Sequence, residues 1–316
     1  MRGSPIHSKV IVLLLALALW SGSALAGSPA GPIAILLSDS DQAYQQQAAA
    51  FSGEVGLPCQ VFDLQGDIKN DPGLKERLFA AKPALIYALG AKAAYLAKIW
   101  TQGQQEIPVL FAMVLNWQRY NLLDGQGNIA GIAAEMAPGT QFVNMTMFSP
   151  GVKRIGLLYS PHSATILAQA RQEAALLGLE LVEEPIERSQ DFQRGFKKIN
   201  GRIDAFWVLN DPVLYTLENL DWLEERCLKE RLLCVGQTQN LAKAGLTLTV
   251  NADVSQIATQ AAAMAGNILL HDQKISEIRV MEPLGTQLLL NLKTAERIGL
   301  AIPTQARSMA TAIIDQ

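Results

Sequence analysis

The side chains that dedicated chemistry requires are scarce in this sequence. Its 316 residues include three cysteines and three histidines, and they contain no G-x-S-x-G, G-x-x-x-x-G-K-[ST], H-E-x-x-H or C-x-x-C motif. Beyond the first 26 residues only His162 and His271 remain, far apart and without neighbouring cysteines. A zinc site needs three or four ligands. The sequence therefore predicts no catalytic residues, no metal site and no cofactor.

Charge is also limited. Charged residues make up 17% of the chain, and the formal net charge is −3. Arg2 and Lys9 are the only charged residues among the first 26, so the remainder carries 24 basic and 29 acidic residues, a net charge of −5. Neutralising phosphates requires clustered Lys and Arg. We therefore expect no nucleic-acid partner.

Long apolar runs are absent except at the start. After a basic beginning, residues 10–20 form an uncharged run of eleven, and Ala24-Leu25-Ala26 supplies the small residues of a cleavage site. A membrane-spanning helix needs about 20 residues. No cysteine follows at Gly27 to carry a lipid anchor. We predict that residues 1–26 are a signal peptide, that the protein is periplasmic, and that it has no stable membrane insertion after cleavage.

The remaining chain alternates short apolar runs with amphipathic stretches. The first part predicts strands at 32–37, 59–64, 84–89, 108–114 and 129–132, with helices at 41–54, 72–81 and 91–100. The second part predicts helices at 139–148, 164–177, 190–199, 212–229, 238–244 and 254–270, and strands at 154–159, 180–183, 205–209, 232–236, 246–250, 279–281 and 286–290. Continuous apolar strands separated by helices indicate parallel sheets covered on both faces. We expect an α/β protein of two Rossmann-like lobes with parallel sheets flanked by helices.

Three cysteines are an odd number for an exported protein. Cys227 falls near the end of a predicted helix and Cys234 in the next strand. They could form a disulfide in an oxidising periplasm, although a helix and its following strand often hold two cysteines too far apart. Cys59 lies in an apolar strand pattern and is expected to be a small buried side chain.

A ligand site is expected in the cleft between the lobes, because open parallel sheets bind ligands beyond the carboxyl ends of their strands. The candidate ligand-binding residues there are Ser38, Asp39, Gly90, Ala91, Asn116, Trp117, Arg119, Ser160, His162, Ser163, Asn210, Asp211, Gln237 and Thr238. Backbone N–H groups at Gly90 and Ala91 could hold a carboxylate at a helix start. Arg119 could pair with a carboxylate or phosphate, and Asp39 or Asp211 with an amine.

Each candidate also has a purely structural interpretation. Ser38, Asp39, Asn210 and Asp211 precede predicted helices and could be N-caps. Trp117 could be a packing residue at the hinge, and Arg119 a solvated loop charge. His162 could make binding pH-dependent or could simply be exposed at a helix start.

Five segments in register resemble one known family. They are residues 149–161 (SPGVKRIGLLYSP), 177–183 (LGLELVE), 291–300 (NLKTAERIGL), 109–112 (VLFA) and 241–245 (LAKAG). The chain resembles the ABC-transporter substrate-binding family whose better-known members bind tryptophan and tyrosine. The resemblance implies a type I periplasmic binding protein fold with three crossovers and an interlobe cleft. The expected division is 27–134 plus 249–282 for the N-terminal lobe and 135–248 plus 283–316 for the C-terminal lobe.

The same resemblance implies a non-enzymatic protein that closes on a small molecule, an amino acid or similar, and delivers it to an ABC permease and ATPase complex in the inner membrane. The strand-end loops depart from the family: residues 114–120 (VLNWQRY) replace Asp-Pro-Val, and Leu89-Gly90-Ala91 replaces Thr-Gly-Thr or Thr-Gly-Ser. The resemblance therefore implies the fold more firmly than the ligand. Alternative functions on the same fold are a ligand-sensing subunit for a membrane receptor and an exported α/β enzyme.

Overall fold

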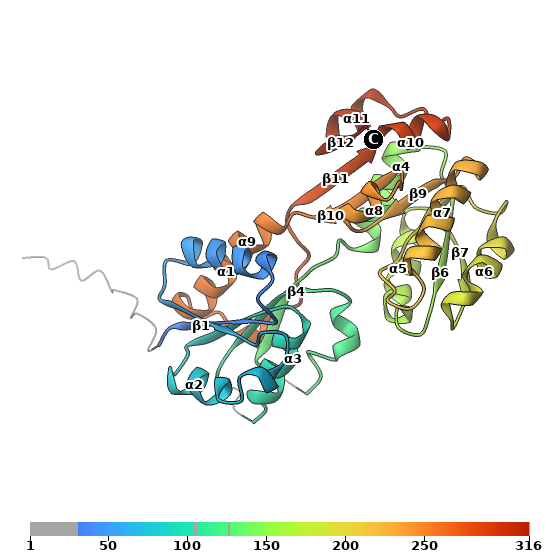
Figure 1. Ribbon diagram of the computed structural model, residues 1–316. Helices are drawn as coiled ribbons and strands as arrows, with labels where there is room; N and C mark the ends of the chain where they lie inside the picture. Colours follow the sequence, from blue (N-terminus) through green and yellow to red (C-terminus); the bar gives the residue numbers. More distant parts are fainter. Residues whose placement is uncertain (1–30, 104–105, 126, 316) are drawn as a thin grey trace, which may run out of the picture.

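The chain folds into two α/β lobes (Figure 1). The computed structural model describes residues 31–103, 106–125 and 127–315. The predicted signal peptide, residues 1–26, lies outside the described residues. The class predicted from the sequence, two α/β lobes whose sheets are flanked by helices, is confirmed.

The first lobe contains a five-stranded parallel sheet in the order β2-β1-β3-β4-β5. Its strands are β1 (Ile33–Leu37), β2 (Cys59–Asp63), β3 (Leu85–Leu89), β4 (Val109–Val114) and β5 (Ile129–Ala133). Every residue of β1 and β3 is buried. A strand covered on both faces must be apolar throughout, which is the pattern that the sequence displays.

Four helices cover this sheet. They are α1 (Gln42–Val55), α2 (Leu74–Ala80), α3 (Ala91–Trp100) and α9 (Val254–Leu270). Helices α1 and α9 lie side by side on one face, and α2 and α3 pack on the other (Figure 1). Helix α9 follows most of the second lobe in the sequence, so the first lobe consists of two separate segments of the chain.

The second lobe contains a seven-stranded sheet in the order β12-β11-β10-β9-β8-β6-β7. Its strands are β6 (Arg154–Tyr159), β7 (Glu180–Pro185), β8 (Ala205–Trp207), β9 (Leu233–Gly236), β10 (Leu248–Ala252), β11 (Thr286–Asn291) and β12 (Ala312–Ile314). All neighbouring pairs are parallel except β10 and β11, which are antiparallel.

Helices cover both faces of the second sheet as well. They are α4 (Pro138–Phe148), α5 (Ala164–Leu176), α6 (Phe192–Ile199), α7 (Leu217–Glu230), α8 (Gln239–Lys243), α10 (Leu292–Arg297) and α11 (Thr304–Met309). Short 3₁₀ turns are η1 (Ile68–Asn70), η2 (Trp117–Tyr120), η3 (Ser189–Asp191) and η4 (Ile275–Glu277). Helices α4 and α5 bury apolar residues against one face, and α6 and α7 against the other.

The chain crosses between the lobes three times. The crossings run from β5 to α4, from β10 to α9, and from Met281, which bridges to Ile132, into β11. Strand β10 pairs with β9 and β11 in the second sheet. The lobe division placed at residue 249 therefore falls after Ala252 instead. The strand expected at 279–281 is reduced to the single bridge at Met281.

The helix predicted at 212–229 begins later, at Leu217. The Asp211 carboxylate accepts hydrogen bonds from the backbone N–H groups of Val213 and Leu214, at 2.9 and 3.2 Å. This turn replaces the first helical residues, and Thr216 then caps α7 by accepting from the N–H of Asn219 at 3.2 Å.

Two of the three cysteines form a disulfide, and the third is a free thiol. Cys227 at the end of α7 and Cys234 in β9 form a disulfide, with their Cα atoms 6.3 Å apart. Helix and strand therefore lie close enough for the pairing that the sequence left open. Cys59 is partly exposed, so its predicted burial is wrong. The reason is that β2 is an edge strand of the first sheet.

Candidate functional site

Two cavities meet at the carboxyl ends of strands β8 and β9. The first, which we call the interlobe cavity, is lined by Asn116, Gln118, Glu135, Met136, Gln141, Ser163, Ile166, Trp207, Leu209, Asn210 and Gln237. The second, the rim cavity, is lined by Val208, Leu209, Asn210, Asp211, Pro212, Tyr215, Leu220, Gln237, Thr238 and Leu241. They share Leu209, Asn210 and Gln237, so they are adjacent.

The two cavities differ in size and in origin. The interlobe cavity has a volume of about 30 Å³, room for about one water molecule. Its lining comes from the first lobe, the first crossing and the second lobe. The rim cavity, about 210 Å³, belongs to the second lobe. A solute larger than water therefore reaches both lobes only if they move relative to one another.

Glu135 joins the two lobes in the interlobe cavity. It lies on the first crossing, between β5 and α4. One carboxylate oxygen, Oε2, accepts from the backbone N–H of Asn116 at 2.8 Å, and the other, Oε1, accepts from the side-chain amide of Asn210 at 2.9 Å. Burial raises the pKa of Glu135 above its ordinary value of 4.5, and the hydrogen bonds from Asn116 and Asn210 offset part of that rise.

Asn116 holds an uncommon backbone conformation at the end of β4. Its φ is +46°, and Met113 of the same segment has a φ of +57°. Positive φ costs little for Asn but is rare for Met. The pairing of β4 with β5 shifts register between Phe111 and Val114. Such backbone strain concentrates at functional sites.

The side chain of Asn116 contacts the second lobe directly. Its amide donates to the backbone carbonyl of His162 at 2.8 Å, and the hydroxyl of Thr165 donates to its Oδ1 at 3.4 Å. The loop after β4 therefore touches the start of α5. Asn116 was predicted as a site residue, and the structure places it where the two lobes meet.

Asp211 is occupied by its own lobe. Its buried carboxylate accepts from the Ser163 hydroxyl at 2.6 Å and from the Ser160 backbone N–H at 3.0 Å, besides the two N–H groups of the following turn. Burial by itself raises the pKa of Asp211, but hydrogen bonds from Ser160, Ser163 and Val213 outweigh it, so the pKa lies below 3.8. Asp211 therefore organises the strand-end loops of the second lobe.

Three candidates of the first lobe, Ser38, Asp39 and Gly90, lie outside both cavities. The buried Ser38 hydroxyl accepts from the backbone N–H of Ala93 at 3.0 Å, and so caps α3. The Asp39 carboxylate accepts from the N–H of Asp41 at 2.8 Å. Gly90 has a φ of +88° at the start of α3. Ser38 therefore caps α3 and not α1, the helix that follows it in the chain, whose N-cap is Asp41.

Several remaining candidates lie outside both cavities. Trp117 packs on Phe111, with ring centroids 6.2 Å apart, and lines a groove on the first lobe. Arg119 is exposed, with its guanidinium 5.2 Å from the Tyr120 ring centroid. The His162 side chain is exposed. Candidates outside the two linings are Ser38, Asp39, Gly90, Ala91, Trp117, Arg119, Ser160 and His162; those in one or both are Asn116, Ser163, Asn210, Asp211, Gln237 and Thr238.

Sequence reasoning missed Glu135. The strand predicted at 129–132 ended too early to give this acid a strand-end position, whereas β5 extends to Ala133. A charged residue among Ala133, Ala134 and Met136, directly after a buried strand, was the available signal. Its meaning depends on the crossing that follows, which sequence spacing did not reveal.

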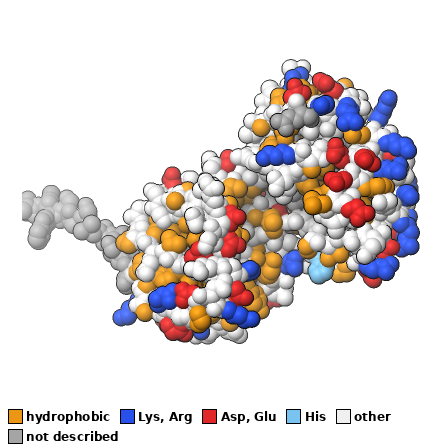
Figure 2. All heavy atoms as spheres, viewed as in Figure 1, with side chains coloured by type: hydrophobic (Ala, Val, Ile, Leu, Met, Phe, Trp, Pro, Cys, Tyr) orange, Lys and Arg blue, Asp and Glu red, His pale blue; other side chains and the backbone are white. Residues whose placement is uncertain are grey.

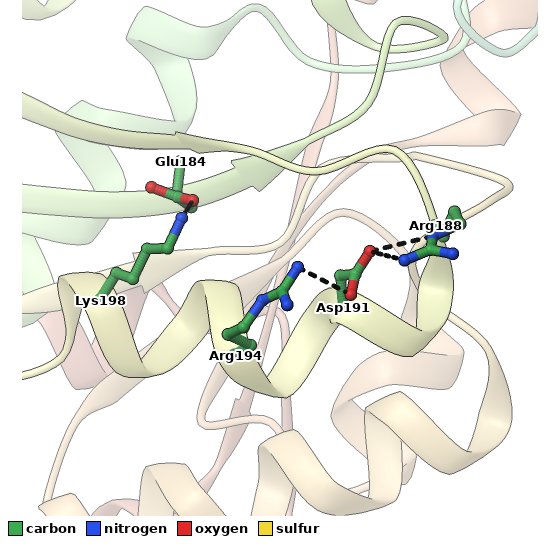
Figure 3. Close-up of polar contacts among 5 residues, drawn as sticks. All are labelled: Glu184, Arg188, Asp191, Arg194 and Lys198. Carbon is green, nitrogen blue, oxygen red and sulfur yellow. Dashed lines mark hydrogen bonds and ion pairs between the residues drawn. The ribbon is translucent and has the colours of Figure 1, made fainter.

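A larger groove lies elsewhere, on the second lobe alone. It measures about 720 Å³. Arg188 and Arg194 each lie 3.0 Å from the Asp191 carboxylate, and Lys198 pairs with Glu184 (Figure 3). Their basic side chains are 58 to 73% exposed. Figure 2 shows Lys and Arg side chains gathered along the outer edge of this lobe, where α6 lies in Figure 1. Because these charges neutralise one another locally, we place the candidate site at the interlobe and rim cavities.

Two α/β lobes, three crossings and a cavity between the lobes with both polar and apolar lining define the class of type I periplasmic binding proteins. Residues 65–314 match the family model of the ABC transporter substrate binding proteins, and the chain belongs to that family. The predicted resemblance is confirmed. A search of curated proteins finds no match. No helix among the described residues is long and apolar enough to cross a membrane.

Solved structures similar to this chain share its fold at low sequence identity. An ABC domain in complex with L-Trp from Streptococcus pneumoniae is 18% identical, with a TM-score of 0.58 over 89% of this chain and 100% of the other. A ligand-free, open substrate-binding protein with adhesive properties from Clostridium difficile is 17% identical, with a TM-score of 0.72 over 90% and 99%. A conserved domain protein from Vibrio cholerae is 18% identical, with a TM-score of 0.59 over 90% and 99%.

Proposed function

We propose that this protein is a periplasmic solute-binding protein that closes its two lobes around a small molecule and delivers it, chemically unchanged, to an ABC importer. The observation that carries the proposal is the interlobe cavity, in which Asn116 of the first lobe, Glu135 of the crossing and Asn210 of the second lobe are joined by hydrogen bonds. Membership of the substrate-binding family supports it.

Lobe closure supplies the affinity in this proposal. In the conformation described here the interlobe cavity is too small for an organic solute. A ligand first binds at the rim cavity, and the first lobe then moves over it about the three crossings. Because contacts with both lobes exist only in the closed form, the ligand shifts the population toward closure. The TM-score is 0.72 with an open, ligand-free structure and 0.58 with an L-Trp complex, which agrees with an open starting state.

The ligand contacts that we propose come from the polar residues lining the two cavities. Ser163, Asn210, Gln237 and Thr238 offer hydrogen-bonding groups from the second lobe, and Asn116 from the first. A few placed polar groups in an otherwise apolar lining are typical of small-molecule sites. We propose an amino acid or a similar small molecule as the ligand, since an L-Trp complex is among the similar structures.

The first residues of the chain and its family support the proposed location. The basic beginning, short apolar run and Ala-Leu-Ala sequence support a signal peptide at residues 1–26. Substrate-binding proteins of this family are extracellular or periplasmic. We therefore propose export to the periplasm and docking on a permease and ATPase complex of the inner membrane.

A thermal-shift screen tests the proposal. The purified protein is heated with amino acids, amines, sugars, nucleosides and organic acids. A ligand that binds only the folded state stabilises it by RT ln(1 + [L]/Kd), about 4 kcal/mol at a thousandfold excess over Kd. We expect Tm to rise with one chemical class, and small-angle scattering to show a smaller radius of gyration with that ligand. No shift across the panel, from folded protein free of co-purified solute, would contradict the proposal.

A further inference from the structure

We propose that the interlobe cavity selects ligands that carry a protonated amine, and that the ammonium group of the ligand pairs with Glu135. This inference rests on the proposed solute-binding function and names the chemical class that the same site takes. It assigns a role to a residue that neither the sequence nor the comparisons identify.

The charge balance of the cavity carries the argument. Among the residues that line the interlobe cavity, Glu135 is the only ionisable one, and none is Lys, Arg or His. No ion pair within the described part of the chain includes Glu135. Its partners, the Asn116 N–H and the Asn210 amide, are neutral. A carboxylate taken out of water without a cation is costly, so a cationic ligand would be stabilised there.

The carboxylate has free acceptor capacity for such a ligand. An ionised carboxyl group offers about four acceptor positions on its two oxygens. Each oxygen of Glu135 accepts one hydrogen bond from the protein. An ammonium group can therefore donate to Glu135 while both bonds between the lobes are kept. Such a ligand strengthens the contact at the point where the lobes are joined.

Other acids near the cleft are less suited to this role. The Asp211 carboxylate already accepts four hydrogen bonds from Ser160, Ser163, Val213 and Leu214. Asp39 lies outside both cavities. Within the described residues, no cluster of three or more His, Cys, Asp and Glu side chains could hold a metal ion. The positive charge is therefore best supplied by an organic ligand.

The rest of the lining indicates the body of that ligand. Met136, Ile166, Trp207 and Leu209 provide apolar surface. The Trp207 indole N–H is bound to the Gln141 side-chain oxygen at 2.7 Å, so it is not available to a ligand. The ammonium group is close to a water molecule in size, and the adjacent rim cavity of about 210 Å³ adds the apolar side chains of Val208, Leu220 and Leu241. An amine whose apolar or aromatic body lies in the rim cavity matches this surface, with Asn210 and Gln237 left to contact further polar groups.

Matched ligand pairs test the inference without altering the protein. Each pair consists of an amine and an analogue of similar shape without the amine: L-tryptophan with indole-3-propionate, L-leucine with 4-methylpentanoate, and phenethylamine with 2-phenylethanol. Binding is measured by calorimetry at pH 7. For any amine that binds, we expect its analogue to bind about tenfold to a hundredfold more weakly, the effect of losing a hydrogen bond to a charged group.

Variants then assign the effect to one carboxylate. Glu135→Gln removes the charge, and Glu187→Gln, which alters an exposed acid in the second-lobe groove, is the matched control. We expect Glu135→Gln to weaken binding of the amine at least tenfold and to leave the analogue unchanged. We expect the control to bind both ligands as the unaltered protein does.

The failures of the two proposals are distinguishable. If neutral or anionic solutes bind with lobe closure and amines do not, the amine inference is overturned and the solute-binding function stands. If an amine binds equally well to Glu135→Gln, the assignment to Glu135 is overturned. If nothing in a wide panel binds to the folded protein, the solute-binding proposal falls and takes the inference with it.

Discussion

The backbone N–H of Asn116 donates a 2.8 Å hydrogen bond to the Glu135 carboxylate. This bond ties the loop after β4 in the first lobe to the first crossing between the lobes. The same carboxylate accepts from Asn210 of the second lobe, so one acidic side chain meets both halves of the molecule. Any movement of the lobes about this crossing must either keep or break these bonds.

The pH dependence of stability should report on Glu135. Its folded-state pKa lies above the ordinary 4.5 because of burial. As pH rises above 4.5, the unfolded chain releases this proton before the folded protein does. The free energy of unfolding therefore falls over this pH range. We expect the Tm of the unaltered protein, minus that of Glu135→Gln, to fall as pH rises from 4.5 toward the raised pKa and then to level off. A difference that stays constant from pH 4 to pH 7 would contradict this account.

Asn116 should tolerate glycine better than alanine. Both substitutions remove the side-chain bond to the His162 carbonyl, but only alanine keeps a Cβ in the left-handed conformation at φ +46°. We expect Asn116→Ala to be less stable than Asn116→Gly by about 1 kcal/mol in urea unfolding. Equal stabilities would mean that the backbone at this position relaxes when the side chain is lost.

A side chain at Gly90, where α3 begins, is expected to destabilise the first lobe. A Cβ there would lie 2.5 Å from the Ser38 hydroxyl oxygen and 2.6 Å from the Tyr44 hydroxyl oxygen, and φ is +88°. Gly56, with φ +64° and open space around a Cβ, is the matched control. We expect Gly56→Ala to cost about 1 kcal/mol and Gly90→Ala about 2–4 kcal/mol, because the latter combines the unfavourable φ with a clash. Chemical denaturation measures the free energy of unfolding of both variants. Similar losses in Gly56→Ala and Gly90→Ala would exclude the clash.

The disulfide should contribute measurably to the stability of the second lobe. It joins Cys227 and Cys234, seven residues apart, and both side chains are buried. The loop-closure model predicts about 2.5 kcal/mol for a loop this short. We expect reduction with dithiothreitol to lower the free energy of unfolding by that amount in a Cys59→Ala background, which removes the remaining thiol. An unchanged unfolding curve, with reduction verified by thiol titration, would refute the prediction.

The local elements were predictable because their signals are local. The apolar runs of β1 and β3 predicted central strands of a covered sheet, and both strands are buried throughout. The start of α7 was predicted wrongly: Asp211 accepts from the N–H groups of Val213 and Leu214 as an N-cap does, but the chain makes only a turn there, and α7 begins at Leu217 with Thr216 as its cap. A helix start depends on which competing cap forms, and that competition depends on neighbouring loops.

By itself the sequence determined the two-lobe α/β class and the family, since hydrophobic periodicity and short in-register segments need no knowledge of long-range contacts. Only the tertiary structure decided that β10 belongs to the second sheet, that Ser38 and Asp211 are engaged within their own lobes, and that Glu135 stands between the lobes. These outcomes rest on contacts between residues far apart in the chain. Glu135 and Asn210, separated by 75 positions, become partners only because the crossing after β5 leads into the second lobe beside the end of β8.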